Sequence, residues 1–117
     1  MSPEPSDALF SRIADRLKAL SDPTRLKILH CLEDSERRVS DILAEVGGSQ
    51  ANVSKHLSRM RLAGIVATRR EGTSVFYRVI DPAAFAICRT VCDSLEQQAE
   101  FEQEALRRGR AAQEGHS

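Results

Sequence analysis

The chain has 117 residues, with 17 Lys and Arg against 17 Asp and Glu, so its formal net charge is zero. Its length fits one domain, and 41% hydrophobic with 29% charged residues is the composition of a globular chain rather than a disordered one. We find no apolar run long enough to span a bilayer and no basic-then-apolar leader, so we expect a cytoplasmic protein without membrane contact. Three cysteines are too few for a disulfide scaffold and fit a reducing compartment.

The charge is distributed unevenly along the chain. Residues 49–80 hold six basic residues against one acidic residue, a net charge of +5, whereas residues 1–48 carry −2 and residues 81–117 carry −3. The local field, rather than the total charge, is what attracts a polyanion. The neutral total therefore does not exclude a nucleic-acid partner, although the same basic cluster is also compatible with an ordinary solvated surface.

The first two predicted helices are separated by a capping signal. Apolar residues at helical spacing predict an amphipathic helix over residues 6–20. Asp22 followed by Pro23 is typical of a helix start, because the carboxylate accepts backbone hydrogen bonds and proline tolerates the first position. We therefore expect a second helix from Pro23, followed by a polar loop over residues 33–38.

Two further helices with a tight turn follow. A short helix is expected over residues 40–46, ended by Gly47 and Gly48. Ser49 then caps a helix that reaches Ala63 and ends at Gly64. Two helices joined by a short glycine-containing turn form the pattern of a helix-turn-helix.

After Gly64 the apolar period changes from 3.6 to 2. This change predicts strands over residues 65–70 and 73–80, joined by a hairpin at Glu71-Gly72. Asp81-Pro82 repeats the helix-start signal and opens a long helix to about Arg108. We expect a mainly α winged helix-turn-helix with a small β-hairpin wing, residues 1–108 as one DNA-binding and dimerisation domain, and residues 109–117 as a disordered tail.

The fourth predicted helix has a polar arc opposite its apolar residues Val53, Leu57 and Met60. The arc consists of Ser49, Asn52, Lys55, His56 and Arg59. Asn, Lys and Arg side chains pair with base edges in the major groove, and short hydroxyls bind phosphates. A basic hairpin suits a contact with phosphate or the minor groove. For an isolated helix a solvated face is the more usual explanation, but turn, arc and hairpin occur here in order. The predicted DNA-binding residues are Ser49, Gln50, Asn52, Ser54, Lys55, His56, Arg59, Arg69, Arg70 and Thr73.

Several segments resemble the ArsR/SmtB family of bacterial repressors. Residues 19–29, ALSDPTRLKIL, are similar to its opening signature, and residues 49–57, SQANVSKHL, to its recognition helix. Residues 62–66 (LAGIV), 69–72 (RREG) and 75–79 (VFYRV) resemble its wing. The resemblance implies a winged-helix homodimer that binds an operator in double-stranded DNA and is released by an inducer, often a metal or metalloid ion. It also implies that the first and last helices form the dimer interface.

The last predicted helix carries a seven-residue apolar repeat that indicates pairing with another helix. Phe85, Cys92, Ala99 and Leu106 recur every seven residues, with Cys88 and Leu95 at the intervening apolar positions. Such a seam predicts coiled-coil-like pairing, and a two-fold dimer would present two recognition helices to a near-palindromic site. The predicted dimer-interface residues are Leu9, Ile13, Phe85, Cys92, Leu95 and Ala99.

Both metal sites familiar from the family are absent. Arg38-Val39-Ser40 stands where a Cys-x-Cys pair is expected, and Pro82-Ala83 follows Asp81 where Asp-x-His is expected. Cys88 and Cys92, at i and i+4, remain as a pair that faces one side of a helix. With Cys31 or the partner's pair, these thiols would suit arsenite, antimonite or another soft metal ion. A thiol-oxidation or persulfide switch and plain packing of buried cysteines are the alternatives.

Two other functional classes are alternatives to a DNA-binding repressor. A winged-helix module could use the same helix and wing to dock an acidic protein. An enzyme is disfavoured, because the sequence shows no catalytic Cys-His-Asp spacing, no phosphate-binding glycine-rich loop and no paired-carboxylate pocket. The favoured function is an inducer-released repressor.

Overall fold

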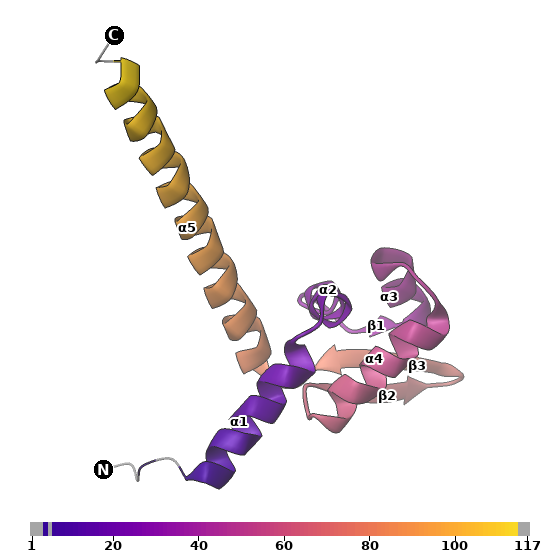
Figure 1. The fold of residues 1–117 in the computed structure, drawn as a ribbon. Coiled ribbons are helices and arrows are strands. Elements are labelled where there is room, and N and C mark those ends of the chain that lie inside the picture. The colour runs from indigo at the N-terminus through magenta and orange to yellow at the C-terminus, as the bar shows by residue number, and fades with distance from the viewer. Residues whose placement is uncertain (1–3, 5, 115–117) are drawn as a thin grey trace. The chain divides into compact units, whose positions relative to one another are not determined.

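The computed structural model describes Glu4 and residues 6–114 (Figure 1). The chain falls into two compact units, the first up to Phe85 and the second from Ala86 onward. Within the described residues, no helix combines the length and apolar character needed to cross a membrane. That residues 1–108 act as one functional domain therefore stays a prediction.

The first unit opens with α1 (Asp7–Leu20) and α2 (Pro23–Cys31). Ser6 caps α1, its Oγ accepting from the Leu9 amide at 3.2 Å. Asp22 caps α2, and its Oδ2 accepts from the amides of Thr24 at 2.9 Å and Arg25 at 3.1 Å. These side chains satisfy amides that the first turn of a helix leaves unpaired. The predicted capping of α2 by Asp22 is confirmed.

The helix-turn-helix consists of α3 (Val39–Val46) and α4 (Gln50–Leu62). Ser49 caps α4 as predicted, with its Oγ accepting from the Asn52 amide at 3.1 Å. Gly64 follows α4 with φ +77°, a left-handed conformation that glycine adopts without steric cost. The chain can therefore turn directly from α4 into the wing.

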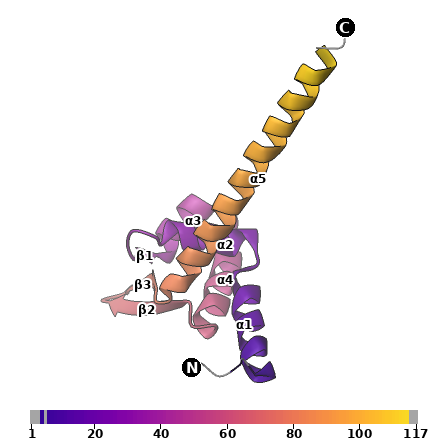
Figure 2. The same ribbon diagram turned by 90° about the vertical axis from the view of Figure 1, so that its left-hand side faces the viewer.

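The wing is a three-stranded antiparallel sheet in the order β1-β3-β2 (Figure 2). Strands β2 (Val66–Glu71) and β3 (Ser74–Val79) pair from Val66 opposite Val79 to Glu71 opposite Ser74. The turn is Gly72-Thr73 rather than the predicted Glu71-Gly72, and Gly72 has φ +61°.

The prediction of a loop throughout residues 33–38 was wrong at its end. Arg37 and Arg38 form β1 and pair with Tyr77 and Phe76 on the free edge of β3. Two residues are too few to show an alternating pattern, and the partner strand lies far along the chain. This strand could therefore not be predicted from local sequence.

The core of the first unit is formed mainly by helices α2 to α4 and the start of the wing. Its largest fully buried side chains are Ile28, Leu29, Ile42, Val53, Leu57, Met60, Ile65 and Val66. The predicted burial of Val53, Leu57 and Met60 is confirmed, and it fixes which side of α4 faces outward. By contrast, the first unit leaves apolar side chains of α1 uncovered, with Leu9, Ile13 and Leu17 each 45–46% exposed.

The last helix, α5 (Pro82–Glu114), is longer than predicted. Asp81 precedes it, and its Oδ1 accepts from the Ala83 amide at 3.0 Å. The prediction of a disordered tail from residue 109 was wrong for residues 109–114, which are helical, whereas residues 115–117 lie outside the described part. Strong helix formers on both sides of Gly109 explain how the helix continues through this position.

Candidate nucleic-acid interface

The outward face of α4 carries side chains suited to reading DNA. Asn52, Lys55 and Arg59 are exposed, and none of these side chains hydrogen-bonds or pairs with another described residue. Ser49 and Gln50, also exposed, lie at the N-terminal end of the helix, while Ser54 is half-buried. The predicted arc is thus a free polar surface over most of its width.

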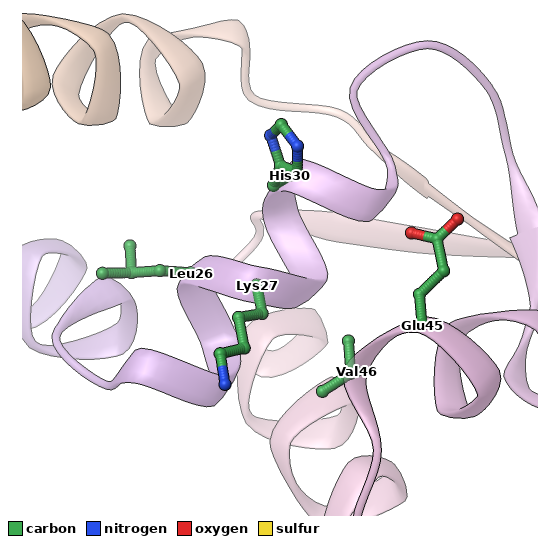
Figure 3. Close-up of a pocket in the computed structure, with 5 residues that line it drawn as sticks. All are labelled: Leu26, Lys27, His30, Glu45 and Val46. Atoms are coloured by element: carbon green, nitrogen blue, oxygen red, sulfur yellow. The ribbon is translucent and has the colours of Figure 1, made fainter.

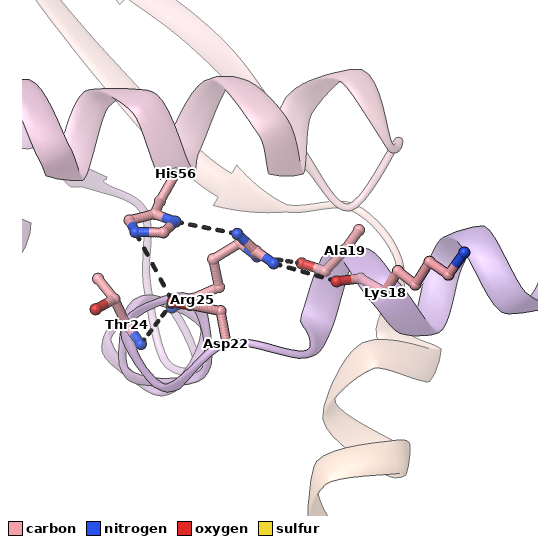
Figure 4. A network of polar contacts seen from close by, with 6 residues as sticks. All are labelled: Lys18, Ala19, Asp22, Thr24, Arg25 and His56. Atoms are coloured by element: carbon pink, nitrogen blue, oxygen red, sulfur yellow. Dashed lines mark hydrogen bonds and ion pairs between the residues drawn. The ribbon is translucent and has the colours of Figure 1, made fainter.

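His56 is the exception to the predicted outward arc. Its side chain is only 15% exposed, with Nδ1 lying 3.1 Å from Nη1 of Arg25 and Nε2 lying 3.8 Å from Oδ2 of Asp22 (Figure 4). At 100° per residue His56 lies about 60° from Val53 around α4, at the border of the buried side, and the start of α2 covers it there. The outward placement was wrong, and Arg25, which our sequence analysis missed, is its main partner.

In the wing, Arg69 is occupied by contacts within the protein. Its Nε donates to both carboxylate oxygens of Glu36, at 3.1 and 3.2 Å, and Nη1 donates to Oε2 of Glu71 at 2.8 Å. The guanidinium also lies 4.7 Å from the centre of the Phe76 ring. The hydrogen bond from Arg69 holds the pKa of Glu36 below its ordinary value. Two carboxylates thus offset the positive charge that Arg69 would offer to a phosphate.

The other predicted wing residues remain available. Arg70 and Thr73 are exposed, and the side chain of neither pairs with another described residue. Successive side chains of a strand point to opposite faces of the sheet, so the side chain of Arg70 lies on the other face of β2 from that of Arg69. Glu36 is a second residue of this site that sequence reasoning missed, because it stands in the segment predicted as a polar loop.

The three cysteines differ in exposure, and the pKa of each thiol is raised. Cys31 is buried, and its pKa is raised to about 11, mainly by burial and secondly by a hydrogen bond with Glu45. Burial also raises the pKa of half-buried Cys88, whereas the charge of Glu96 is the main cause for exposed Cys92. Each thiol is therefore mostly protonated near neutral pH, which does not favour a reactive thiolate.

Within the described part of the chain, no group of three or more His, Cys, Asp or Glu residues lies close enough to hold a metal ion. Cys31 belongs to the first unit, whereas Cys88 and Cys92 belong to the second. A soft ion would consequently need more ligands than any one cluster of described residues in a single chain supplies.

A small pocket of about 340 Å³ lies between α2 and α3 (Figure 3). Its lining residues are Leu26, Lys27, His30, Glu45 and Val46. None of them is a predicted DNA-binding residue, so the pocket is separate from the polar face of α4.

Comparison with known proteins identifies the class of this site. Residues 22–68 match the family model described as bacterial regulatory protein, arsR family. The chain is 39% identical over 83 residues to the uncharacterised HTH-type transcriptional regulator MJ1325 of Methanocaldococcus jannaschii, a match that spans 70% of this chain and 93% of that protein. The chain belongs to the ArsR family. It is also 39% identical over 67 residues to KmtR of Mycobacterium tuberculosis, covering 57% of this chain and about half (52%) of that regulator.

Solved structures of ArsR-type proteins share the fold. The homodimeric winged helix-turn-helix domain Mb0332 from Mycobacterium bovis superposes with a TM-score of 0.70 at 32% identity, over 83% of this chain and 95% of that one. The antimony-specific transcriptional repressor AntR superposes with a TM-score of 0.74 at 26% identity, over 85% of this chain and 90% of that one. The predicted winged helix-turn-helix fold of the ArsR type is confirmed. The predicted function class, a DNA-binding transcriptional repressor, is confirmed as well. Family and fold are those of regulators rather than of enzymes.

Proposed function

We propose that this ArsR-family chain binds an operator in double-stranded DNA with α4 in the major groove. The observation that carries the proposal is the free, exposed set Asn52, Lys55 and Arg59 on the side of α4 opposite its buried residues. Ser49 and Gln50 would meet the groove edge at the start of the helix, where amides and hydroxyls bind phosphate, and Ser54 would follow one turn further along. Arg70 and Thr73 would add a wing contact, whereas Arg69 would act mainly to hold the wing together.

The proposed active species is a homodimer. The apolar face of α1, with Leu9 and Ile13, is exposed in the single chain, and Leu95 in the second unit is 60% exposed. Phe85, Cys92 and Ala99 continue the heptad seam of α5. The homodimeric Mycobacterium bovis relative supports this assembly, in which residues 1–108 would act as one DNA-binding and dimerisation domain. Two copies of α4 would then read a near-palindromic site.

DNA binding can be tested without knowing the operator. Wild-type protein is used to enrich duplexes from a randomised pool of about 30 base pairs, enough for two half-sites one helical turn apart. The Kd of an enriched duplex is then measured against salt for wild type and for the double variant Lys55→Ala/Arg59→Ala. A double variant that removes two exposed basic residues elsewhere, Lys27→Ala/Arg110→Ala, is the control.

We expect the α4 double variant to lose selective binding and the control variant to keep it. Equal binding by both variants would show that α4 is not the DNA-reading element. If wild type enriched no duplex and did not bind DNA in a salt-dependent way, docking of an acidic protein on the same helix and wing would replace the proposal.

The inducer proposal rests on Cys88 and Cys92, one helical turn apart on α5. Two sulfurs at this spacing suit a soft ion, and a second pair would come from the partner copy. The antimony-specific relative favours such an ion, with arsenite or antimonite as the class; oxidation or persulfide formation is the alternative. Cys31 is a weaker third ligand because its thiol is buried.

Release of the enriched duplex is measured with antimonite, arsenite, peroxide and polysulfide, for wild type and for Cys88→Ser/Cys92→Ser. We expect one of these reagents to release wild type but not the double variant. Release of both proteins alike, or of neither, would mean that the two cysteines only pack.

A further inference from the structure

Arg25 is a charged residue inside the first unit, only 8% exposed, and its guanidinium joins three elements (Figure 4). Nε donates to the carbonyl oxygen of Ala19 at 2.7 Å, and Nη2 donates to that of Lys18 at 3.1 Å. Nη1 lies 3.1 Å from Nδ1 of His56 on α4. One side chain of α2 therefore bonds the end of α1 and the middle of α4.

The chemistry of the guanidinium determines which nitrogen of His56 carries the proton. Arginine has only donors, so Nδ1 of His56 must accept the hydrogen bond and the proton must reside on Nε2. Nε2 faces the carboxylate of Asp22, with 3.8 Å between Nε2 and Oδ2. The ring is thus held between a donor on one side and a negative charge on the other.

The bonded elements have different tasks in the proposed repressor. The last carbonyls of a helix have no partner within that helix, and Arg25 donates hydrogen bonds to two of those in α1, at Lys18 and Ala19. The same helix carries the uncovered apolar face with Leu9 and Ile13, while α4 carries the DNA-reading arc. A contact that fixes the angle between α1 and α4 therefore also fixes the angle between the proposed dimer surface and the proposed DNA-binding surface.

We propose that Arg25 is a positioning residue that, through Nδ1 of His56, sets the direction of α4 relative to α1. In the dimer this contact determines the spacing of the two recognition helices, which must match half-sites one helical turn apart. The inference rests on the proposed function but names residues that do not themselves touch DNA. Sequence-specific binding depends on the Arg25–His56 contact, whereas charge-driven binding does not.

Two substitutions at one position separate positioning from other roles. His56→Asn keeps a side-chain acceptor near the position of Nδ1, whereas His56→Leu keeps an apolar side chain of similar length without an acceptor. We expect His56→Leu to bind the enriched duplex about tenfold more weakly than wild type, the scale of one lost charge-assisted hydrogen bond. His56→Asn should stay within about threefold of wild type by the same scale. Binding to a duplex of random sequence should be unchanged in both, because Lys55 and Arg59 remain.

A substitution of Arg25 and a spectroscopic measurement on His56 test the same contact independently. Lysine can reach one carbonyl but lacks the planar fork that bonds three acceptors, so Arg25→Lys should show the same selective loss as His56→Leu. Nitrogen-15 spectra of the ring should show His56 with its proton on Nε2 in wild type and a mixture of tautomers in Arg25→Lys. The tautomer reports whether the contact between Arg25 and Nδ1 is made in solution, and the selective loss of binding to the enriched duplex reports its positioning role.

The outcomes distinguish this inference from the proposed function. A wild type that enriches no duplex overturns DNA reading itself. A wild type that enriches duplexes while His56→Leu binds them equally well overturns only the positioning role. A His56→Leu variant that changes the preferred base at one position shows a direct base contact instead. Equal loss of enriched and random duplexes, with a lower melting temperature, shows that the contact serves folding alone.

Discussion

Arg69 in β2 and Glu36, which precedes β1, form a bidentate ion pair: Nε donates to both carboxylate oxygens, at 3.1 and 3.2 Å, and Nη2 donates to Oε1. Glu71 and the Phe76 ring engage the same guanidinium. This pair ties the segment before α3 to the hairpin that follows α4. Part of the positive charge expected to meet DNA is thereby used inside the protein.

Replacing Glu36 should release this charge. In Glu36→Gln, Arg69 loses its main carboxylate partner and becomes free to reach a phosphate. We expect tighter DNA binding at low salt and a slope of log Kd against log salt that is steeper by about 0.9, the value for one further phosphate contact. The matched control, Asp34→Asn, removes one exposed negative charge from the same segment. An unchanged slope in Glu36→Gln would mean that Arg69 does not reach the phosphates.

Asn52 should contribute base readout rather than charge. We expect Asn52→Ala to weaken binding to the enriched duplex by about 1–3 kcal/mol, the range for a bidentate contact with a base, and to leave binding to a random duplex unchanged. Ser58→Ala is the control, because Ser58 is exposed on α4 but outside the predicted arc. Competition titrations with the two duplexes measure the difference, and parallel losses on both would argue against base readout by Asn52.

A charge in the α5 seam should separate the two copies. Leu95 is 60% exposed in the single chain, so we expect Leu95→Glu to convert the dimer into monomers by placing like charges opposite each other in the seam. Gln97→Glu adds the same charge to the same helix at a position outside the heptad pattern. Native mass spectrometry and sedimentation velocity report the mass, and a Leu95→Glu protein that stays dimeric would rule out this seam.

The buried thiol of Cys31 should make stability depend on alkaline pH. Its pKa is raised from an ordinary 9.0 to about 11 in the folded chain, so the unfolded chain releases this proton first as the pH rises. The raised pKa contributes fully to the free energy of unfolding below pH 9. As the pH rises towards 11 this contribution, on the order of 1–2 kcal/mol, is lost. Urea unfolding at several pH values measures the change.

Two variants separate titration from packing in this experiment. Cys31→Ala should remove that part of the pH dependence. Leu29→Ala, which empties a neighbouring buried position, should cost about 2–5 kcal/mol at every pH without altering the slope. An identical pH dependence in wild type and Cys31→Ala would show that another group is responsible.

Local signals in the sequence were sufficient for most of the fold. Capping by Asp22 and Ser49 and the turn at Gly64 act over three or four residues, so they can be read directly from the chain. The apolar period of α4 also predicted its buried side, and with it the outward placement of Asn52, Lys55 and Arg59. The family resemblance agreed with these elements because it rests on the same short segments.

Contacts between distant segments were decided only by the tertiary structure. The β1 strand exists because β3 offers it a free edge, and His56, at the border of the buried side of α4, is covered because Arg25 and Asp22 lie beside it. Arg69 is restrained because Glu36, distant in sequence, is brought beside it. The exposed polar side of α4 within the basic middle segment could thus be predicted from the sequence by itself, since helical period is a local property. Which of its charges stay free for DNA depended on long-range packing, which no local pattern records.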